Sequence, residues 1–224
     1  MEKIIVTNVE KSYDRHVLGP CSFVVEEGKT LAIMGPSGSG KSTLIKGCAG
    51  LIEVDGQIEI RDLKRLVMVF DEARLIDVMN AKDNIALGMK KEGYSDSQIN
   101  SRMIEIAEKL KIEELLEKRP NELSYGQRQR VALARALIRD FDVLLMDEPF
   151  SGLDVLLRKE ILLMLKQMQK QQGFTCLYVT HDASDAKVFS DQVLVLKDGK
   201  MEVLDTVEQC IHHPVNAFVQ AFFE

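Results

Sequence analysis

Residues 35–42 constrain the fold of this chain more than any other stretch. They read GPSGSGKS and match the pattern G-x-x-x-x-G-K-[ST] at every fixed position. Residues 30–34 predict a short buried strand in front of this loop, and residues 43–49 predict a helix start behind it, which is the setting of a phosphate-binding loop. The alternative, a glycine- and serine-rich surface turn, explains neither flank.

The loop predicts a cradle for the phosphate groups of a nucleotide. Its glycines lack the Cβ atom that would keep phosphate oxygens away from backbone N–H groups, and the following helix adds its positive N-terminal end. We expect Lys41 to place its charge on the phosphates and Ser42 to put its hydroxyl on Mg²⁺.

Composition permits one large α/β domain or a domain with an inserted subdomain, and it argues against several functions. The chain has 224 residues, 46% of them apolar, which is enough for a substantial core. Its net charge of -6 is spread along the sequence, whereas nucleic-acid binders concentrate positive charge on one face. Four widely separated cysteines without a C-x-x-C pair suggest neither zinc nor disulfides and fit a reducing cytoplasm. Without an apolar signal region or a membrane-length apolar run, a membrane function would need a partner that spans the bilayer.

Strands are predicted on both sides of the loop. Residues 3–9 and 22–26 read as strands, with a turn at Gly19 and Pro20 between them. Tyr13 lies in the same interval, where edge packing and stacking on a nucleobase are both open readings.

The next part of the chain changes in character. Residues 57–61 and 66–70 read as strands, residues 71–82 as a loop, and residues 95–118 as a helical insertion that begins at a capping box. Farther along, Ser124 and Gln127 precede a predicted helix over residues 128–139. They offer a second capping box, and the same helix N-terminus offers free N–H groups to an anion.

Two predicted buried strands end at chemically active side chains. Residues 141–146 form an apolar run that stops at Asp147 and Glu148, and residues 174–180 form another that stops at His181. Because α/β sheets bind ligands at the carboxyl ends of their strands, we expect Asp147 to bind the Mg²⁺ hydration shell and Glu148 to activate a water molecule. A lone histidine is more often structural than catalytic, and the position of His181 at a strand end counts in favour of a catalytic role.

The remaining segments complete an alternating α/β pattern. They predict a turn at residues 151–154, a helix over residues 155–172, a hairpin of strands over residues 191–197 and 200–204, and two short terminal helices.

In this order the segments resemble the ATP-binding subunit of an ABC transporter over nearly the whole chain. Residues 35–42 look like the Walker A loop, and residues 123–127, LSYGQ, look like the signature normally written LSGGQ. Residues 143–148 are similar to Walker B with its catalytic glutamate, residues 151–154 to the D-loop, and His181 to the switch histidine.

The resemblance implies the fold class. It is α/β, a P-loop NTPase core with a mostly parallel sheet, an N-terminal antiparallel β subdomain and an inserted helical subdomain. One domain would cover residues 1–224, with the RecA-like core in residues 1–82 and 142–224 and the helical subdomain, with the signature, in residues 83–141.

The resemblance also implies ATP hydrolysis with ATP and Mg²⁺. Catalysis would rest on Glu148, His181 and Lys41, and the metal would be held by Ser42, Asp147 and Asp71. The nucleotide would be bound by Tyr13, Gly35, Pro36, Ser37, Gly38, Ser39, Gly40, Lys41, Ser42, Thr43, Ser124, Gly126 and Gln127. Each ATP would lie between the loop of one copy and the signature of a second, in a two-fold dimer.

The implied partners are a second copy of the chain, transmembrane permease subunits and, indirectly, a solute-binding protein, with no nucleic acid. The permease would contact the groove beside residues 71–84, and the protein would be cytoplasmic, peripheral on the inner face of the cell membrane. Residues 70–75 and 214–219 look most like bacterial importer ATPases of the nitrate, sulfonate or taurine type.

Two departures from the family pattern leave alternatives open. Asp71 stands where the family has glutamine, and Tyr125 replaces the first signature glycine. One alternative is a soluble ABC ATPase that remodels a macromolecular assembly, but no fused second ATPase domain or coiled coil favours it. The other is an ATP-binding member with little turnover because of Asp71, against which Glu148 and His181 argue.

Overall fold

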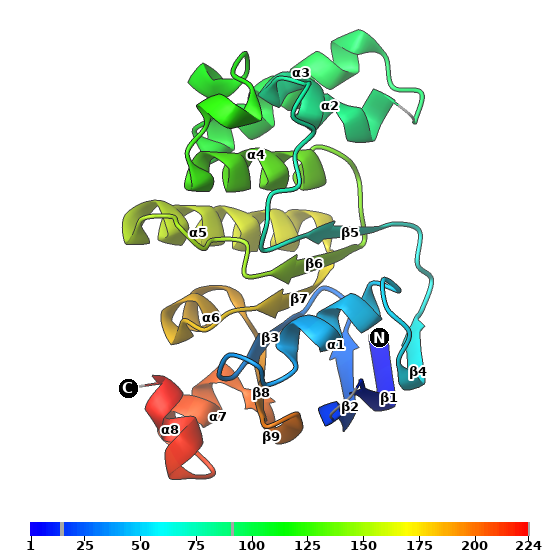
Figure 1. The fold of residues 1–224 in the computed structure, drawn as a ribbon, viewed down its shortest axis with the longest axis vertical. Helices are drawn as coiled ribbons and strands as arrows, with labels where there is room; N and C mark the ends of the chain where they lie inside the picture. The colour runs from blue at the N-terminus through cyan, green and yellow to red at the C-terminus, as the bar shows by residue number, and fades with distance from the viewer. Residues whose placement is uncertain (14–15, 91, 224) are drawn as a thin grey trace.

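A six-stranded sheet runs through the middle of the molecule (Figure 1). The structure is a computed structural model that describes residues 1–13, 16–90 and 92–223. All strands of this sheet run parallel except the last, which is antiparallel, so the predicted mostly parallel sheet is confirmed. In spatial order the strands are β5 (Leu66–Val69), β6 (Val143–Asp147), β7 (Thr175–Val179), β3 (Thr30–Met34), β8 (Gln192–Lys197) and β9 (Lys200–Thr206).

Both faces of the central strands are buried, which explains their continuous apolar runs. In β6, Val143 and Leu145 pack on the side of α1 (Lys41–Cys48), whereas Leu144 and Met146 pack on the side of α4 (Tyr125–Leu137) and α5 (Val155–Gln172). All four side chains are fully buried. The sheet therefore separates the phosphate-loop helix from α4 and α5.

A second, antiparallel sheet of β2 (His16–Glu26), β1 (Glu2–Ser12) and β4 (Asp55–Ile60) confirms the predicted N-terminal β subdomain. It packs on α1 and on the adjacent face of the large sheet. The predicted turn at Gly19 and Pro20 is wrong, because β2 continues through both residues. The Gly19 N–H donates to the carbonyl oxygen of Gly199 at 2.7 Å, so contact with the β8–β9 hairpin supports the strand there. The strands predicted over residues 57–61 and 66–70 exist, but they belong to different sheets.

The backbone of β2 in this second sheet packs directly against the backbone of the phosphate loop and of the β8–β9 turn. A Cβ atom at Gly40 would lie 2.9 Å from the carbonyl oxygen of Val17, and a Cβ at Gly199 would lie 2.8 Å from the same oxygen. Both glycines also have positive φ angles, 98° and 78°. We call the contact of Gly40 and Gly199 with Val17 the glycine joint.

Helices gather at the end of the molecule farthest from the C-terminal helices (Figure 1). They are α2 (Ala81–Lys90), α3 (Asp96–Leu110), η1 (Glu113–Leu115), η2 (Pro120–Glu122) and α4. The capping box at Ser95 and Gln98 is confirmed, but α3 ends well before residue 118 because Lys111 adopts a left-handed conformation. Helix α2 was not predicted, and its first residues fall in the segment expected to be a loop.

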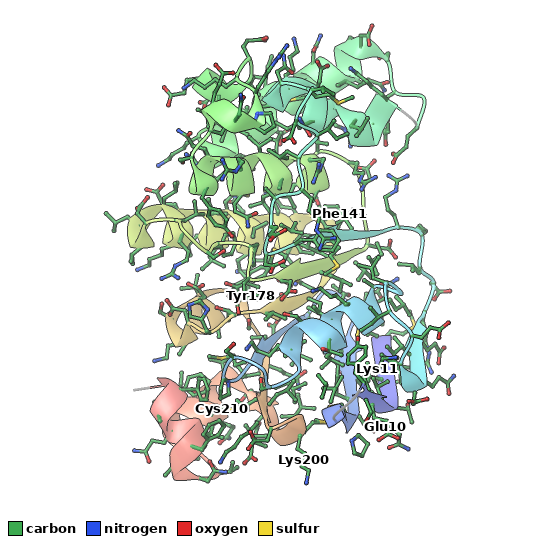
Figure 2. All side chains as sticks on the ribbon, viewed as in Figure 1. Glu10, Lys11, Phe141, Tyr178, Lys200 and Cys210 are labelled. Atoms are coloured by element: carbon green, nitrogen blue, oxygen red, sulfur yellow. The ribbon has the colours of Figure 1, made fainter. Side chains whose placement is uncertain are left out.

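Most of the remaining chain follows the predicted pattern, with one added helix. Helix α5 spans the predicted residues, the β8–β9 hairpin is present, and α7 (Val207–His212) and α8 (Ala217–Phe223) end the fold. Helix α6 (Ala183–Phe189), which was not predicted, lies beside β7, where Figure 2 labels Tyr178. The Tyr178 ring packs at 5.9 Å between centroids on both Phe150 and Phe189.

Two further properties of the described residues concern the length of the helices and the state of the cysteines. None of the helices in the described ranges is long and apolar enough to cross a membrane. All four cysteines are free and buried, and burial raises the pKa of Cys21 and Cys210 to about 11 and that of Cys48 to about 12.

Candidate functional site

The loop between β3 and α1 forms one wall of a pocket of about 470 Å³. A Cβ atom built on Gly38 would meet no described atom within 4 Å, so this side of the loop is open to a ligand. The pocket is lined by Val17, Gly35, Pro36, Ser37, Gly38, Gly40, Lys41, Ser42, Thr43, Glu148, His181 and Phe222. Most of the predicted phosphate-binding residues thus share one pocket with Glu148 and His181.

Lys41 is folded back onto its own loop. Its Nζ donates to the carbonyl oxygens of Gly35 at 2.8 Å and Pro36 at 2.9 Å, and the residue is only 7% exposed. Burial lowers the pKa of Lys41, and the negative charges of Glu148 and Asp147 oppose that shift. A phosphate group that displaced the two carbonyl oxygens would give this ammonium a charged partner in place of neutral ones.

Asp147 and Ser42 form a candidate cation site beside the pocket, which Ser42 lines, whereas Asp147 and Asp71 are absent from its described lining. The Ser42 hydroxyl donates to Asp147 Oδ1 at 3.0 Å. Asp147 Oδ2 is buried and finds no hydrogen-bond partner among the residues that the structure describes. Burial raises the pKa of Asp147, and the charges of Asp71 and Glu148 act in the same direction while the Ser42 hydroxyl opposes them. A carboxylate held in this way fits a bound Mg²⁺, which would supply the missing partner.

No complete cage for a metal is present in the described part of the chain. No group of three or more histidine, cysteine, aspartate or glutamate side chains lies close enough together there to hold an ion. Mg²⁺ commonly takes one or two protein ligands, with substrate phosphates and water filling the remaining positions. The Ser42–Asp147 pair matches that sparse arrangement.

Glu148 and His181 face each other at the open side of the pocket. His181 Nδ1 lies 3.4 Å from Glu148 Oε2, and the side chains are 64% and 33% exposed. Glu148 has a φ of 45°, an uncommon value for a residue with a side chain, and its N–H donates to the Val179 carbonyl oxygen at 3.2 Å. The chain therefore turns sharply after β6 at the residue that places a carboxylate beside the phosphate loop.

Partly buried ion pairs hold the segment that carries His181. The Thr180 hydroxyl accepts a hydrogen bond from the Asp182 N–H at 3.0 Å. Arg158 on α5 lies 2.6 Å from Asp182 and 3.3 Å from Asp185, both of which follow the histidine. Sequence reasoning missed Arg158 and Asp185, because a single arginine in an amphipathic helix and an aspartate in an unpredicted one give no functional signal.

The signature residues lie away from this pocket. Ser124 caps α4: its Oγ accepts from the Gln127 N–H at 3.3 Å, and Gln127 Oε1 accepts from the Ser124 N–H at 2.9 Å, so the capping box is confirmed. Figure 1 shows α4 beyond α5, whereas α1 lies on the other face of the sheet. Within the described chain Ser124, Gly126 and Gln127 do not line the pocket.

Several expected contacts differ in the structure. Tyr13 is 61% exposed and is absent from the described pocket lining, with the Lys11 ammonium 5.2 Å from its ring centroid. Val17 and Phe222 line the pocket although sequence reasoning named neither. No pattern marked Phe222, which lies in a short aromatic terminal helix. Ser39 is not in the lining, and its buried hydroxyl has no partner among the described residues.

Comparison with known proteins agrees with this geometry. A family model described as "ABC transporter" matches residues 18–151, more than half of the chain. The chain belongs to the ABC transporter family.

Curated relatives of this ABC cassette are import ATP-binding proteins. It is 36% identical to the sn-glycerol-3-phosphate import ATP-binding protein UgpC of Jannaschia sp. (strain CCS1), over 99% of this chain and 67% of the relative. It is 37% identical to the xylose/arabinose import ATP-binding protein XacJ of Haloferax volcanii, over 99% of this chain and 61% of that protein. A UgpC of Vibrio vulnificus (strain YJ016) is 38% identical over 89% of this chain and 56% of its own length. The cassette thus spans between 56% and 67% of these relatives.

A solved structure has the same fold as this ABC cassette. It is a dimeric post-hydrolysis state of an ATP-binding cassette bound to ADP and Pi, with a TM-score of 0.83 and 31% identity over 91% of this chain and 98% of that one. The names of the curated relatives give no support to the expected nitrate, sulfonate or taurine subtype.

Proposed function

We propose that this ABC cassette is the ATP-hydrolysing subunit of an importer for a small solute and that ATP-driven closure of its dimer powers transport. The observation that carries the proposal is the convergence of the phosphate loop, Glu148 and His181 on one pocket, with Asp147 hydrogen-bonded to Ser42 of its lining. Curated relatives named as importers of sn-glycerol-3-phosphate and of xylose/arabinose support the direction of transport.

The residues of the pocket have separate tasks in this proposal. Lys41 exchanges the carbonyl oxygens of Gly35 and Pro36 for phosphate oxygens. Ser42 and Asp147 would hold Mg²⁺, which would supply positive charge beside the phosphate groups. Glu148 accepts a proton from the attacking water, and His181, 3.4 Å from that carboxylate, orients the reacting groups.

The signature completes the site from a second copy. Helix α4 offers the N–H groups of its first turn and the Ser124 hydroxyl, and none of these reaches the pocket of its own chain as described. If a phosphate site is shared between two copies, the pocket of one copy and the start of α4 of the other bind the same nucleotide. The dimeric structural relative supports this arrangement.

Transmembrane permease subunits are the proposed partners outside the dimer. Val78 is 81% exposed and Ile76 is 36% exposed in the segment between β5 and α2. A groove of about 450 Å³ lies nearby between α2 and α4, lined by Leu87, Gly88, Ala132 and Arg135 among others. The cassette then lies on the cytoplasmic face of the membrane, with a solute-binding protein acting indirectly. In this proposal the helical subdomain covers residues 83–141, and the RecA-like core covers residues 1–82 and 142–224.

Purified protein tests the proposed function directly. The unsubstituted chain should release phosphate from ATP in the presence of Mg²⁺, and Lys41→Ala should lower the rate about tenfold or more because the phosphates lose a charged partner. Lys159→Ala removes an exposed lysine on α5 and serves as the matched control that keeps the parent rate. No phosphate release by the parent, or an unchanged rate in Lys41→Ala, would overturn the proposal.

Asp71→Gln should raise basal turnover and increase the Mg²⁺ concentration needed for half-maximal rate. The Asp71 charge reaches Asp147, whose pKa it raises, so it attracts the cation but also repels the reacting phosphate. We expect changes of about two- to fivefold in each quantity, measured by Mg²⁺ titration of phosphate release. If neither quantity moves, Asp71 has no part in the metal site.

A further inference from the structure

Tyr125, the residue that departs from the signature pattern, contacts two other loops of the site. Its ring lies against Gly152, where a Cβ atom would come within 2.6 Å of Tyr125 Cδ1. Its hydroxyl donates to the carbonyl oxygen of Asp71 at 2.7 Å and lies 3.1 Å from Ser151 Oγ. The two departures from the family pattern, Asp71 and Tyr125, are therefore joined by a direct hydrogen bond.

Gln129, one turn along α4, strengthens the same contact. It is 1% exposed, and its Nε2 donates to the Asp71 carbonyl oxygen and lies 3.3 Å from the Tyr125 hydroxyl oxygen. Because Tyr125 has only one hydroxyl hydrogen, which the Asp71 carbonyl accepts, Gln129 and Ser151 meet its oxygen as donors. We call Tyr125, Gln129, Asp71 and Ser151 the tyrosine clamp.

The tyrosine clamp reaches both carboxylate-bearing segments of the pocket. The Ser151 N–H donates to the Glu148 carbonyl oxygen at 3.3 Å. Ser151 Oγ lies 3.2 Å from the same oxygen, but its single hydrogen serves the Tyr125 oxygen. On the other side, β5 runs parallel beside β6 with Val69 opposite Met146, so Asp71 leaves the sheet at the same edge as Asp147. The charge of Asp71 accordingly acts with burial to raise the pKa of Asp147. The start of α4 is thus connected to the turn after Glu148 and to the charge beside the metal site.

We propose that Tyr125 is a positioning residue whose hydroxyl holds the Asp71 loop in the arrangement that brings the Asp71 carboxylate to the Mg²⁺ side of the pocket. This inference rests on the proposed function, since it concerns the same metal–nucleotide site. Glycine at this position has no hydroxyl with which to hold the loop. Residues 71–74 would then still be held, among the described residues, by the amide of Gln129 and by the guanidinium of Arg135, which donates to the carbonyl oxygens of Ala73 and Arg74 at 2.9 Å.

Tyr125→Phe is the variant that tests the proposal, because it keeps the ring on Gly152 and removes only the hydroxyl. It should raise the Mg²⁺ concentration for half-maximal ATP hydrolysis about threefold, while ATP affinity measured without Mg²⁺ stays at the parent value. In an Asp71→Gln background the same substitution should leave the Mg²⁺ requirement unchanged, because the carboxylate through which Tyr125 acts is gone.

A matched control variant shows whether the effect of Tyr125→Phe comes from the position of the Asp71 segment or from a general loss of stability. A measurement on protein without ATP or metal serves the same purpose. Tyr94→Phe removes a hydroxyl that donates to Asp140 at 3.1 Å in the helical part. In nucleotide-free protein, the carbonyl ¹³C resonance of Asp71 and the amide resonance of Ser151 should both move in Tyr125→Phe and should both stay in place in Tyr94→Phe.

Each possible result of these experiments either supports or overturns the role proposed for Tyr125. Moved resonances together with a higher Mg²⁺ requirement that vanishes in the Asp71→Gln background support the proposal. Unmoved resonances, a parent-like Mg²⁺ requirement, or an equal effect in the Asp71→Gln background overturn it. A parent chain that hydrolyses no ATP fails the proposed function instead, and the resonances still report whether the tyrosine clamp exists.

Discussion

Glu148→Gln is expected to lower ATP turnover about 100-fold or more and to trap the protein as a closed dimer with Mg-ATP. Glutamine keeps the size and hydrogen-bonding reach of the glutamate beside His181 but is a poor base. Binding therefore survives while proton removal from the attacking water does not. Single-turnover phosphate release measures the rate, and size-exclusion chromatography with Mg-ATP measures the dimer.

Glu160→Gln provides the matched control for that variant. Glu160 lies on α5, is 56% exposed and pairs with Lys111, far from any assigned role at the pocket. It should turn over ATP like the parent. Single-turnover release by Glu148→Gln at the parent rate would remove Glu148 from the catalytic role.

Of two mixed dimers that carry the same two substitutions, one should hydrolyse ATP and the other should be inactive. A Lys41→Ala copy paired with a Ser124→Arg copy leaves one shared site with both defects and the other with none. This dimer should keep roughly half of the parent turnover if the two sites act independently. Tandem affinity tags isolate each mixed dimer before phosphate release is measured.

The matched control places the same two substitutions on a single copy. A Lys41→Ala/Ser124→Arg copy paired with an unsubstituted copy damages both shared sites, so this dimer should be inactive. If each chain instead used its own signature, the unsubstituted copy would remain active and the first dimer would be inactive. Activity in the second dimer and none in the first would therefore refute shared sites.

Sequence could predict those parts of the fold and of the site that depend on local chemistry. The run ending at Asp147 predicted a strand because a parallel strand buried on both faces must be apolar throughout, and β6 has that form. Ser124 and Gln127 predicted a cap because the cap needs only two side chains one helical turn apart. The phosphate loop followed from its glycines and its two flanks in the same way.

Other features depended on contacts between segments far apart in the chain. The strand through Gly19 is supported by Gly199, which no local pattern links to it. The link between Asp71 and Tyr125 joins residues 54 positions apart, so each appeared only as a separate departure from the family pattern. Phe222 reaches the pocket because α8 folds back to the phosphate loop, a placement set by tertiary packing alone.

The glycine joint limits how this protein can vary. At Gly40 and Gly199 any substitution would add atoms where the Val17 carbonyl oxygen already lies, within 3 Å of an added Cβ in both cases. The spacing between the two sheets at the pocket therefore cannot be adjusted in small steps by exchanging side chains there, since the contact contains no side chain to enlarge or trim. Position 71 follows β5 and position 125 opens α4, and both carry a side chain, so changes in rate can accumulate there while the pocket walls keep their separation. Almost no substitution should accordingly be tolerated at Gly40 and Gly199 of the glycine joint. Substitutions at Asp71 and Tyr125 of the tyrosine clamp should change the rate by degrees.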